Sequence, residues 1–182
     1  MTATGAQMLV APREVHDLVF RCARIAGFDV GAADRASRNV TYSEVHFGAA
    51  VATFASVLAD PQRLESEYGT GPDALALAEV EARVKGIGSV VFGTGVPLAA
   101  LASGIAEITG RGLGVGGVPA GATAATLVEA LQVGGPAIPA DDAAGDRAAR
   151  EGLVVDRVAF SALTEAAKAF LVSEEILDEI ED

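Results

Sequence analysis

Three polar side chains are spaced so that they could share one face of a helix. Tyr42 and His46 are four residues apart, and Asn39 extends the same face by a further turn. A histidine in this place could transfer a proton near neutral pH, while Tyr42 or Asn39 orients a substrate oxygen. The alternative is a partly exposed histidine on a helix flank. The spacing therefore makes His46, Tyr42 and Asn39 candidate catalytic residues.

A second candidate is the glycine-rich stretch 110–119, GRGLGVGGVP, which contains the spacing G-x-G-x-x-G at Gly112, Gly114 and Gly117. A dinucleotide site needs its glycines between a strand and a helix, so that the pyrophosphate meets free helix N–H groups. The residues before this stretch, PLAALASGIAEITG, are typical of a helix instead. No acidic residue follows at the distance expected for a ribose contact. A glycine-rich strand or bend with close backbone packing is the competing interpretation.

The strand-turn-helix order is better matched upstream, where Gly93 and Gly95 follow the β-like run 89–92. The tripeptide GVP occurs at 95–97 and again at 117–119, which suggests two copies of one strand-turn-helix unit. We expect Gly93 and Gly95, and likewise Gly116 and Gly117, to lie at helix N-termini. There they could bind a small anionic ligand, whose identity as a cofactor the sequence leaves unknown.

The remaining pattern predicts the elements that position these residues. Apolar residues recur every three or four positions from Pro12 to Gly27, and again from about residue 31 to 59, which predicts two amphipathic helices. Turn formers and charges at 61–72 indicate a connector. Further helices are expected at about 73–85 and 160–170, a strand near 153–156, and a loop over 134–152 with acidic residues at 141, 142 and 146.

We therefore predict an α/β or α+β fold in which an N-terminal helical hairpin packs on a small sheet. That sheet would be built from the glycine-rich units around 89–133 and the strand near 153–156. The predicted organisation is a disordered arm over 1–11, the helical hairpin over 12–60, the connector over 61–72, and one α/β part over 73–182 packed on the hairpin.

Composition excludes several classes of function. The formal charge of -12 would repel nucleic acid and an anionic membrane surface, and no run approaches the roughly 20 apolar residues of a membrane-spanning helix. With only Cys22, no intramolecular disulfide can form, and a cytoplasmic location is expected. One cysteine and two histidines do not favour a zinc site, so no metal is expected. The abundant small apolar residues favour a homo- or hetero-oligomer.

Both ends of the chain resemble known sequences. The run EVHDLVFRCARIAGFDVGAADRASRNV and the close GLVVDRVAFSALTEAAKAFLVSEE resemble the two ends of a bacterial family of about 200 residues without assigned function. The helix-Ala-Gly-helix opening is more faintly similar to the N-terminal helices of the malate and lactate dehydrogenases outside the Rossmann class. Those enzymes carry an Asp-Ser-His-Gly signature, whereas this chain has His46-Phe47-Gly48 without the Asp-Ser pair.

These observations leave three hypotheses for function. The first is a cytoplasmic small-molecule-binding protein or accessory subunit of a metabolic enzyme complex. The second is a stand-alone small-molecule enzyme that uses His46 as its general acid or base. The third is a structural interaction protein. The substrate and the reaction cannot be predicted from the residues.

Overall fold

A hairpin of two helices forms the N-terminal part of the fold, as predicted. Helix α1 spans Pro12–Ile25 and helix α2 spans Val30–Phe47. Pro12 occupies the first turn, where its missing N–H costs nothing. Asp29 caps α2 by accepting a hydrogen bond from the Ala32 N–H at 2.8 Å. The computed structural model describes residues 6–138 and 142–178, of which 171–178 are described as backbone only.

The predicted second helix ends twelve residues early. Gly48 and Ala49 both have positive φ, 67° and 62°, and a separate helix α3 begins at Ala50 (Ala50–Ala55). The break is held by Glu44, whose buried carboxylate accepts hydrogen bonds from the backbone N–H groups of Ala49, Ala50 and Val51. The prediction of one continuous helix over 31–59 was therefore wrong, because the Glu44 side chain, one turn before the break, stabilises the break.

The predicted connector at 61–72 is helical. Asp60 caps α4 (Pro61–Leu64), a π-helical turn η1 follows (Glu65–Thr70), and α5 continues directly (Gly71–Lys85). The prolines that suggested a linker occupy the first turns of α4 and α5. The interpretation as a connector was wrong because proline is compatible with a helix start, and the glycines here lie inside helical turns.

Two small antiparallel sheets replace the single sheet that was predicted. Strands β2 (Ile87–Pro97), β3 (Leu113–Gly116) and β4 (Leu127–Pro136) pair in the order β2-β4-β3. The C-terminal strand β5 (Leu153–Asp156) pairs instead with β1 (Gln7–Val10), Val10 lying opposite Leu153. The disordered arm was therefore wrong for residues 7–10, because β5 supplies a partner strand that local sequence cannot reveal; residues 1–5 lie outside the described residues.

The predicted strand-turn-helix repeat is absent from residues 87–136. In the first copy, β2 runs through Gly93 and Gly95 to Pro97, and only then come the short 3-10 turn η2 (Leu98–Ala100) and helix α6 (Ala102–Gly110). In the second copy no helix follows Gly117, since the chain loops into β4. Gly95 has a φ of 75° where the register of β2 against β4 shifts, so it serves a bulge inside the strand.

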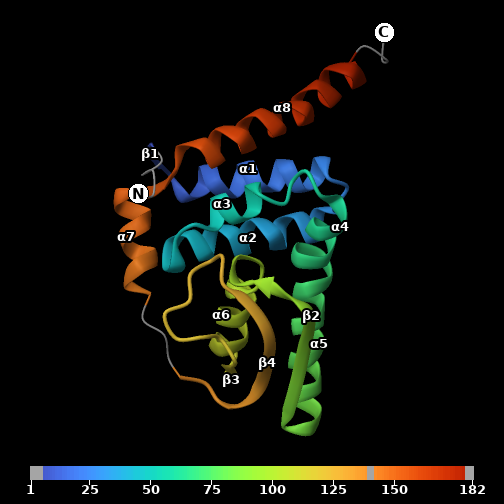
Figure 1. Cartoon of the computed structure of the whole chain (residues 1–182), viewed down its shortest axis with the longest axis vertical. Coiled ribbons are helices and arrows are strands. Elements are labelled where there is room, and N and C mark those ends of the chain that lie inside the picture. Colours follow the sequence, from blue (N-terminus) through green and yellow to red (C-terminus); the bar gives the residue numbers. More distant parts are fainter. Residues whose placement is uncertain (1–5, 139–141, 179–182) are drawn as a thin grey trace.

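Two helices complete the fold. Helix α7 spans Ala143–Glu151, so the loop predicted over 134–152 was wrong for those residues, where alanine favours helix. Helix α8 spans Arg157–Asp178 and includes the helix predicted at 160–170. Figure 1 shows α8 lying along α1, while α5, β2 and β4 extend from the helical layer as a second unit beside α6. The protein is thus α+β, and one cluster of buried residues continues through both units.

Candidate functional site

His46 and Tyr42 are half-buried and lie together on one face of α2, as their four-residue spacing predicts. Their rings are stacked, with centroids 4.0 Å apart and planes inclined by 28°. The His46 Nε2 atom lies 3.5 Å from the Oδ1 atom of Asp142, which immediately precedes α7. His46 is therefore placed between an aromatic face and a carboxylate, an arrangement that orients an imidazole for proton transfer.

These residues line a cavity of about 360 Å³ between α1, α2, α6 and α7, which we call the histidine cavity. Its polar lining includes both histidines of the chain, since His16 of α1 faces the same space as His46. The polar and charged lining residues are His16, Arg38, Thr41, Tyr42, His46, Ser103 and Asp142.

His16 is not among the candidate residues that the sequence indicated. In the structure its Nε2 atom lies 3.5 Å from Asp34 Oδ1, and its Nδ1 atom lies 3.7 Å from Asp17 Oδ1. The place of His16 at the cavity depends on how α1 packs against α2, which the spacing of residues along one helix does not show.

The electrostatics of Tyr42 favour its neutral form. Burial raises the pKa of the Tyr42 phenol, and the nearby Asp142 carboxylate raises the same pKa further. The phenol thus keeps its proton and is a hydrogen-bond donor toward the cavity. A donor beside an imidazole and a carboxylate can orient a carbonyl or hydroxyl oxygen.

Asn39 does not join this site. It is 2% exposed, and its Oδ1 atom accepts hydrogen bonds from the N–H groups of Ser103 at 3.0 Å and Gly104 at 3.3 Å. These are orphan donors of the first turn of α6. Asn39 therefore anchors α6 to α2, and only two of the three predicted residues line the histidine cavity.

The four predicted glycines are not at helix N-termini. Gly93 and Gly95 lie within β2, Gly116 ends β3, and Gly117 follows it with a φ of 109°. A Cβ atom at Gly117 would collide with the carbonyl oxygen of Ala130 in β4. The premise of an anion site on helix N–H groups was wrong here, because these glycines permit a bulge and a close approach of β-strands.

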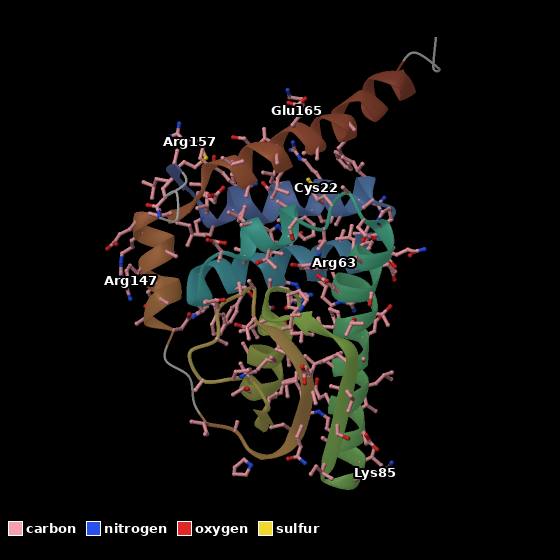
Figure 2. All side chains as sticks on the ribbon, in the orientation of Figure 1. Cys22, Arg63, Lys85, Arg147, Arg157 and Glu165 are labelled. Carbon is pink, nitrogen blue, oxygen red and sulfur yellow. The ribbon has the colours of Figure 1, made fainter. Side chains whose placement is uncertain are left out.

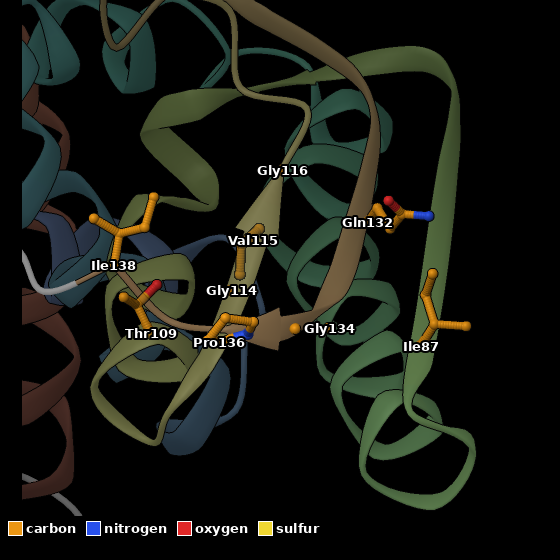
Figure 3. Close-up of a pocket in the computed structure, with 10 residues that line it drawn as sticks. Ile87, Thr109, Gly114, Val115, Gly116, Gln132, Gly134, Pro136 and Ile138 are labelled. Carbon is orange, nitrogen blue, oxygen red and sulfur yellow. The ribbon is translucent and has the colours of Figure 1, made fainter.

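Gly116 does line a cavity of about 490 Å³ over the three-stranded sheet, which we call the sheet cavity (Figure 3). Figure 3 shows lining residues from β2, β3 and β4, with Thr109 from the end of α6 and Ile138 from the segment after β4. None of the lining residues carries a charge. This cavity therefore supplies no cation for an anionic group.

A third cavity, of about 680 Å³, lies between α2, α6 and the loop after β3; we call it the aliphatic cavity. Tyr42 and Asp142 line it as well as the histidine cavity. Thr109 and Ile138 line both it and the sheet cavity. The apolar side chains of its lining come mainly from α2, η2 and α6: Phe47, Leu98, Ala102, Ile105 and Ala106.

Cys22 is not part of any site. It lies between α1 and α8 (Figure 2), is 3% exposed, and its Sγ atom donates to the Leu163 carbonyl at 3.4 Å. Burial raises the pKa of the Cys22 thiol to about 11. The thiolate that nucleophilic catalysis requires is therefore disfavoured.

Neither a metal cluster nor a membrane span is present in the described residues. No group of three or more His, Cys, Asp or Glu side chains is placed there to hold an ion, and Asp141 of the predicted acidic loop lies outside the described residues. None of the described helices is long and apolar enough to cross a membrane.

Comparison with known proteins adds no family to this geometry. No protein-family model matches the chain, nor does any curated protein or solved structure. The resemblances of the two chain ends therefore stay predictions, and the function must be argued from the site.

Proposed function

We propose that this chain is a small-molecule-binding protein of the cytoplasm whose ligand occupies the histidine cavity, acting alone or as an accessory subunit of a metabolic enzyme. The observation that carries the proposal is the convergence of both histidines, Tyr42 and Asp142 on one cavity. Ligand sites are typically concave, with a few convergent polar groups on an otherwise apolar wall. In the histidine cavity the polar groups converge, and proline, valine, glycine and alanine complete the lining.

The charges of the cavity disfavour an anionic ligand head. Arg38 is engaged by two carboxylates, donating to Asp34 at 3.0 Å and to Glu107 at 2.6 Å. Asp142 adds a further negative charge at the cavity wall. An anionic ligand would meet this carboxylate without a free guanidinium to compensate for it.

Nuclear magnetic resonance of isotope-labelled histidine side chains tests the proposal. The chain has two histidines, so His16 and His46 give two sets of ring signals that single substitutions assign. Titration with a panel of neutral metabolites is expected to find a saturable ligand that shifts the signals of both histidines. A panel in which every ligand leaves both signals unchanged would contradict the proposal.

Acid–base catalysis by His46 is the second candidate, and the Asp142–His46–Tyr42 arrangement is the observation that favours it. The Asp142 carboxylate can orient the imidazole of His46, and the adjacent phenol of Tyr42 can orient the reacting oxygen. For a metabolite that is turned over, His46→Ala should abolish turnover while the circular dichroism spectrum and the melting temperature stay near those of the wild type. Unchanged turnover in this variant would remove the second candidate.

A further inference from the structure

The histidine cavity and the aliphatic cavity are adjoining compartments. Both are lined by Tyr42 and Asp142, so these two side chains mark the boundary between them. One compartment is rich in hydrogen-bonding groups. The other is lined mainly by apolar side chains, aromatic ones from α2 and aliphatic ones from η2 and α6. A ligand that reaches across the boundary would thus meet polar groups at one end and apolar groups at the other.

The polar compartment contains neutral side chains that can form hydrogen bonds. The hydroxyl oxygen of Thr41 is buried and has no hydrogen-bond partner in the part of the chain that the structure describes, although Thr41 lines the cavity. The neutral phenol of Tyr42 and the imidazole of His46 lie on the same helix. The phenol and the imidazole can therefore form hydrogen bonds with a hydroxyl or carbonyl group of a ligand.

The aliphatic compartment is large enough for a substantial apolar group. Its volume of about 680 Å³ falls in the range of ligand pockets, roughly 300 to 1,000 Å³. Ile105 and Ala106 of α6 are only partly buried and face this space. Covering these side chains with a ligand tail removes further apolar surface from water.

From this continuity we infer that the ligand is amphipathic, with an uncharged hydrogen-bonding head over His46 and Tyr42 and an aliphatic tail along α6. The inference rests on the proposed function, since it describes the ligand of the same site. Tyr42 contacts both parts of the ligand, the phenol facing the head and the ring covering the start of the tail.

Straight-chain primary alcohols from butanol to decanol provide the probe, because their head is neutral and only the tail length varies. Binding is followed by the histidine ring signals and by the methyl signals of Ile105 in the complete protein. We expect the dissociation constant to fall by about fourfold for each added methylene until the compartment is filled. The shift of the Ile105 methyl signals should grow along the series.

Ala106→Trp places a large side chain in the aliphatic compartment, so the dissociation constant should depend less steeply on tail length. Ala120→Trp is the matched control, because Ala120 is exposed in the loop after β3 and lines none of the three cavities. The control should keep the wild-type slope. If Ala106→Trp fails to fold, the dissociation constants of the alcohols for the wild-type protein still test the inference.

Two results would overturn the inference. One is a histidine response to butanol with the same affinity for every longer alcohol, which would leave the proposed function standing without an aliphatic tail. The other is binding of long alcohols that shifts neither the Ile105 methyl signals nor the histidine signals. Failure of the proposed function itself looks different, because then no compound of the neutral metabolite panel shifts either histidine.

Discussion

Glu44 shows at the scale of one residue how the chain uses a buried charge. Its side chain is 8% exposed, and its carboxylate accepts from three consecutive backbone N–H groups at the start of α3. Burial is the largest influence and raises the pKa of the Glu44 carboxyl, while the three hydrogen bonds lower that pKa in part. The negative charge of Asp156 raises the pKa further.

The raised pKa predicts the direction of a pH effect on stability. Because the pKa of Glu44 is higher in the folded state than in the unfolded state, its contribution to stability is full below the ordinary value of 4.5 and is lost as pH rises through the folded pKa. Glu44→Gln removes this titration. The free energy of unfolding of the wild type, measured in urea and compared with that of Glu44→Gln, should therefore decrease from about pH 4.5 toward neutrality. An increase over the same pH range would contradict this account.

The burial of Cys22 predicts that its thiol reacts slowly in the folded protein. With its thiol buried against Leu163 and its pKa raised to about 11, the native protein should react with a thiol reagent at mildly alkaline pH far more slowly than the urea-unfolded protein does. The measurement is the absorbance change on disulfide exchange with an aromatic disulfide. Equal rates in the two states would show that the α1–α8 contact opens freely.

At the scale of elements, α6 depends on a side chain from another helix. Asn39 of α2 accepts from two N–H groups in the first turn of α6, and α6 carries much of the wall of the aliphatic cavity. The position of that wall is therefore set by α2, which also carries Tyr42 and His46.

Asn39→Ala should destabilise the protein by about 2 kcal/mol, because two buried N–H groups lose their acceptor. Urea unfolding measures this difference. Asn39→Asp keeps an acceptor oxygen at the same place and should lose less stability than the alanine variant. If the alanine variant is as stable as the wild type, Asn39 is not the anchor of α6.

The elements that could be predicted are those with strong local patterns. The periodic apolar residues of α1 and α2 made the helical hairpin predictable, and the run 153–156 was correctly assigned to a strand. The elements that could not be predicted depend on distant partners. Strand β1 exists because β5 pairs with it, and the end of α2 is determined by the hydrogen bonds of Glu44 rather than by a proline.

The candidate site was predictable to a similar extent. The four-residue spacing of Tyr42 and His46 placed them together correctly, because such spacing fixes their relative position on any helix. Asn39 lies on the same helix, but α6 packs over it, and its side chain accepts a hydrogen bond from the first turn of α6. His16 and Asp142 reach the site from other helices or from the residue before one, so their contribution depends on tertiary packing that one sequence does not display.

At the scale of the whole molecule, Figure 1 shows the helical layer of α1 and α2 next to α6 and α7. The histidine cavity and the aliphatic cavity are lined by residues of these helices and of the loops beside them. The expected homo- or hetero-oligomer stays a prediction, which light scattering at a series of protein concentrations checks.

The expected absence of nucleic-acid binding likewise stays a prediction, based on the charge of -12.

The central claim is that one ligand contacts both histidines and Tyr42 within a single cavity. The most direct test is the histidine-labelled titration, extended by selective labelling of the two tyrosines of the chain. We predict that a ligand which shifts the His46 signal also shifts those of His16 and Tyr42 with the same dissociation constant, while Tyr68, buried beside Phe54, stays unchanged. Saturable binding that leaves His16, His46 and Tyr42 unchanged would contradict the account.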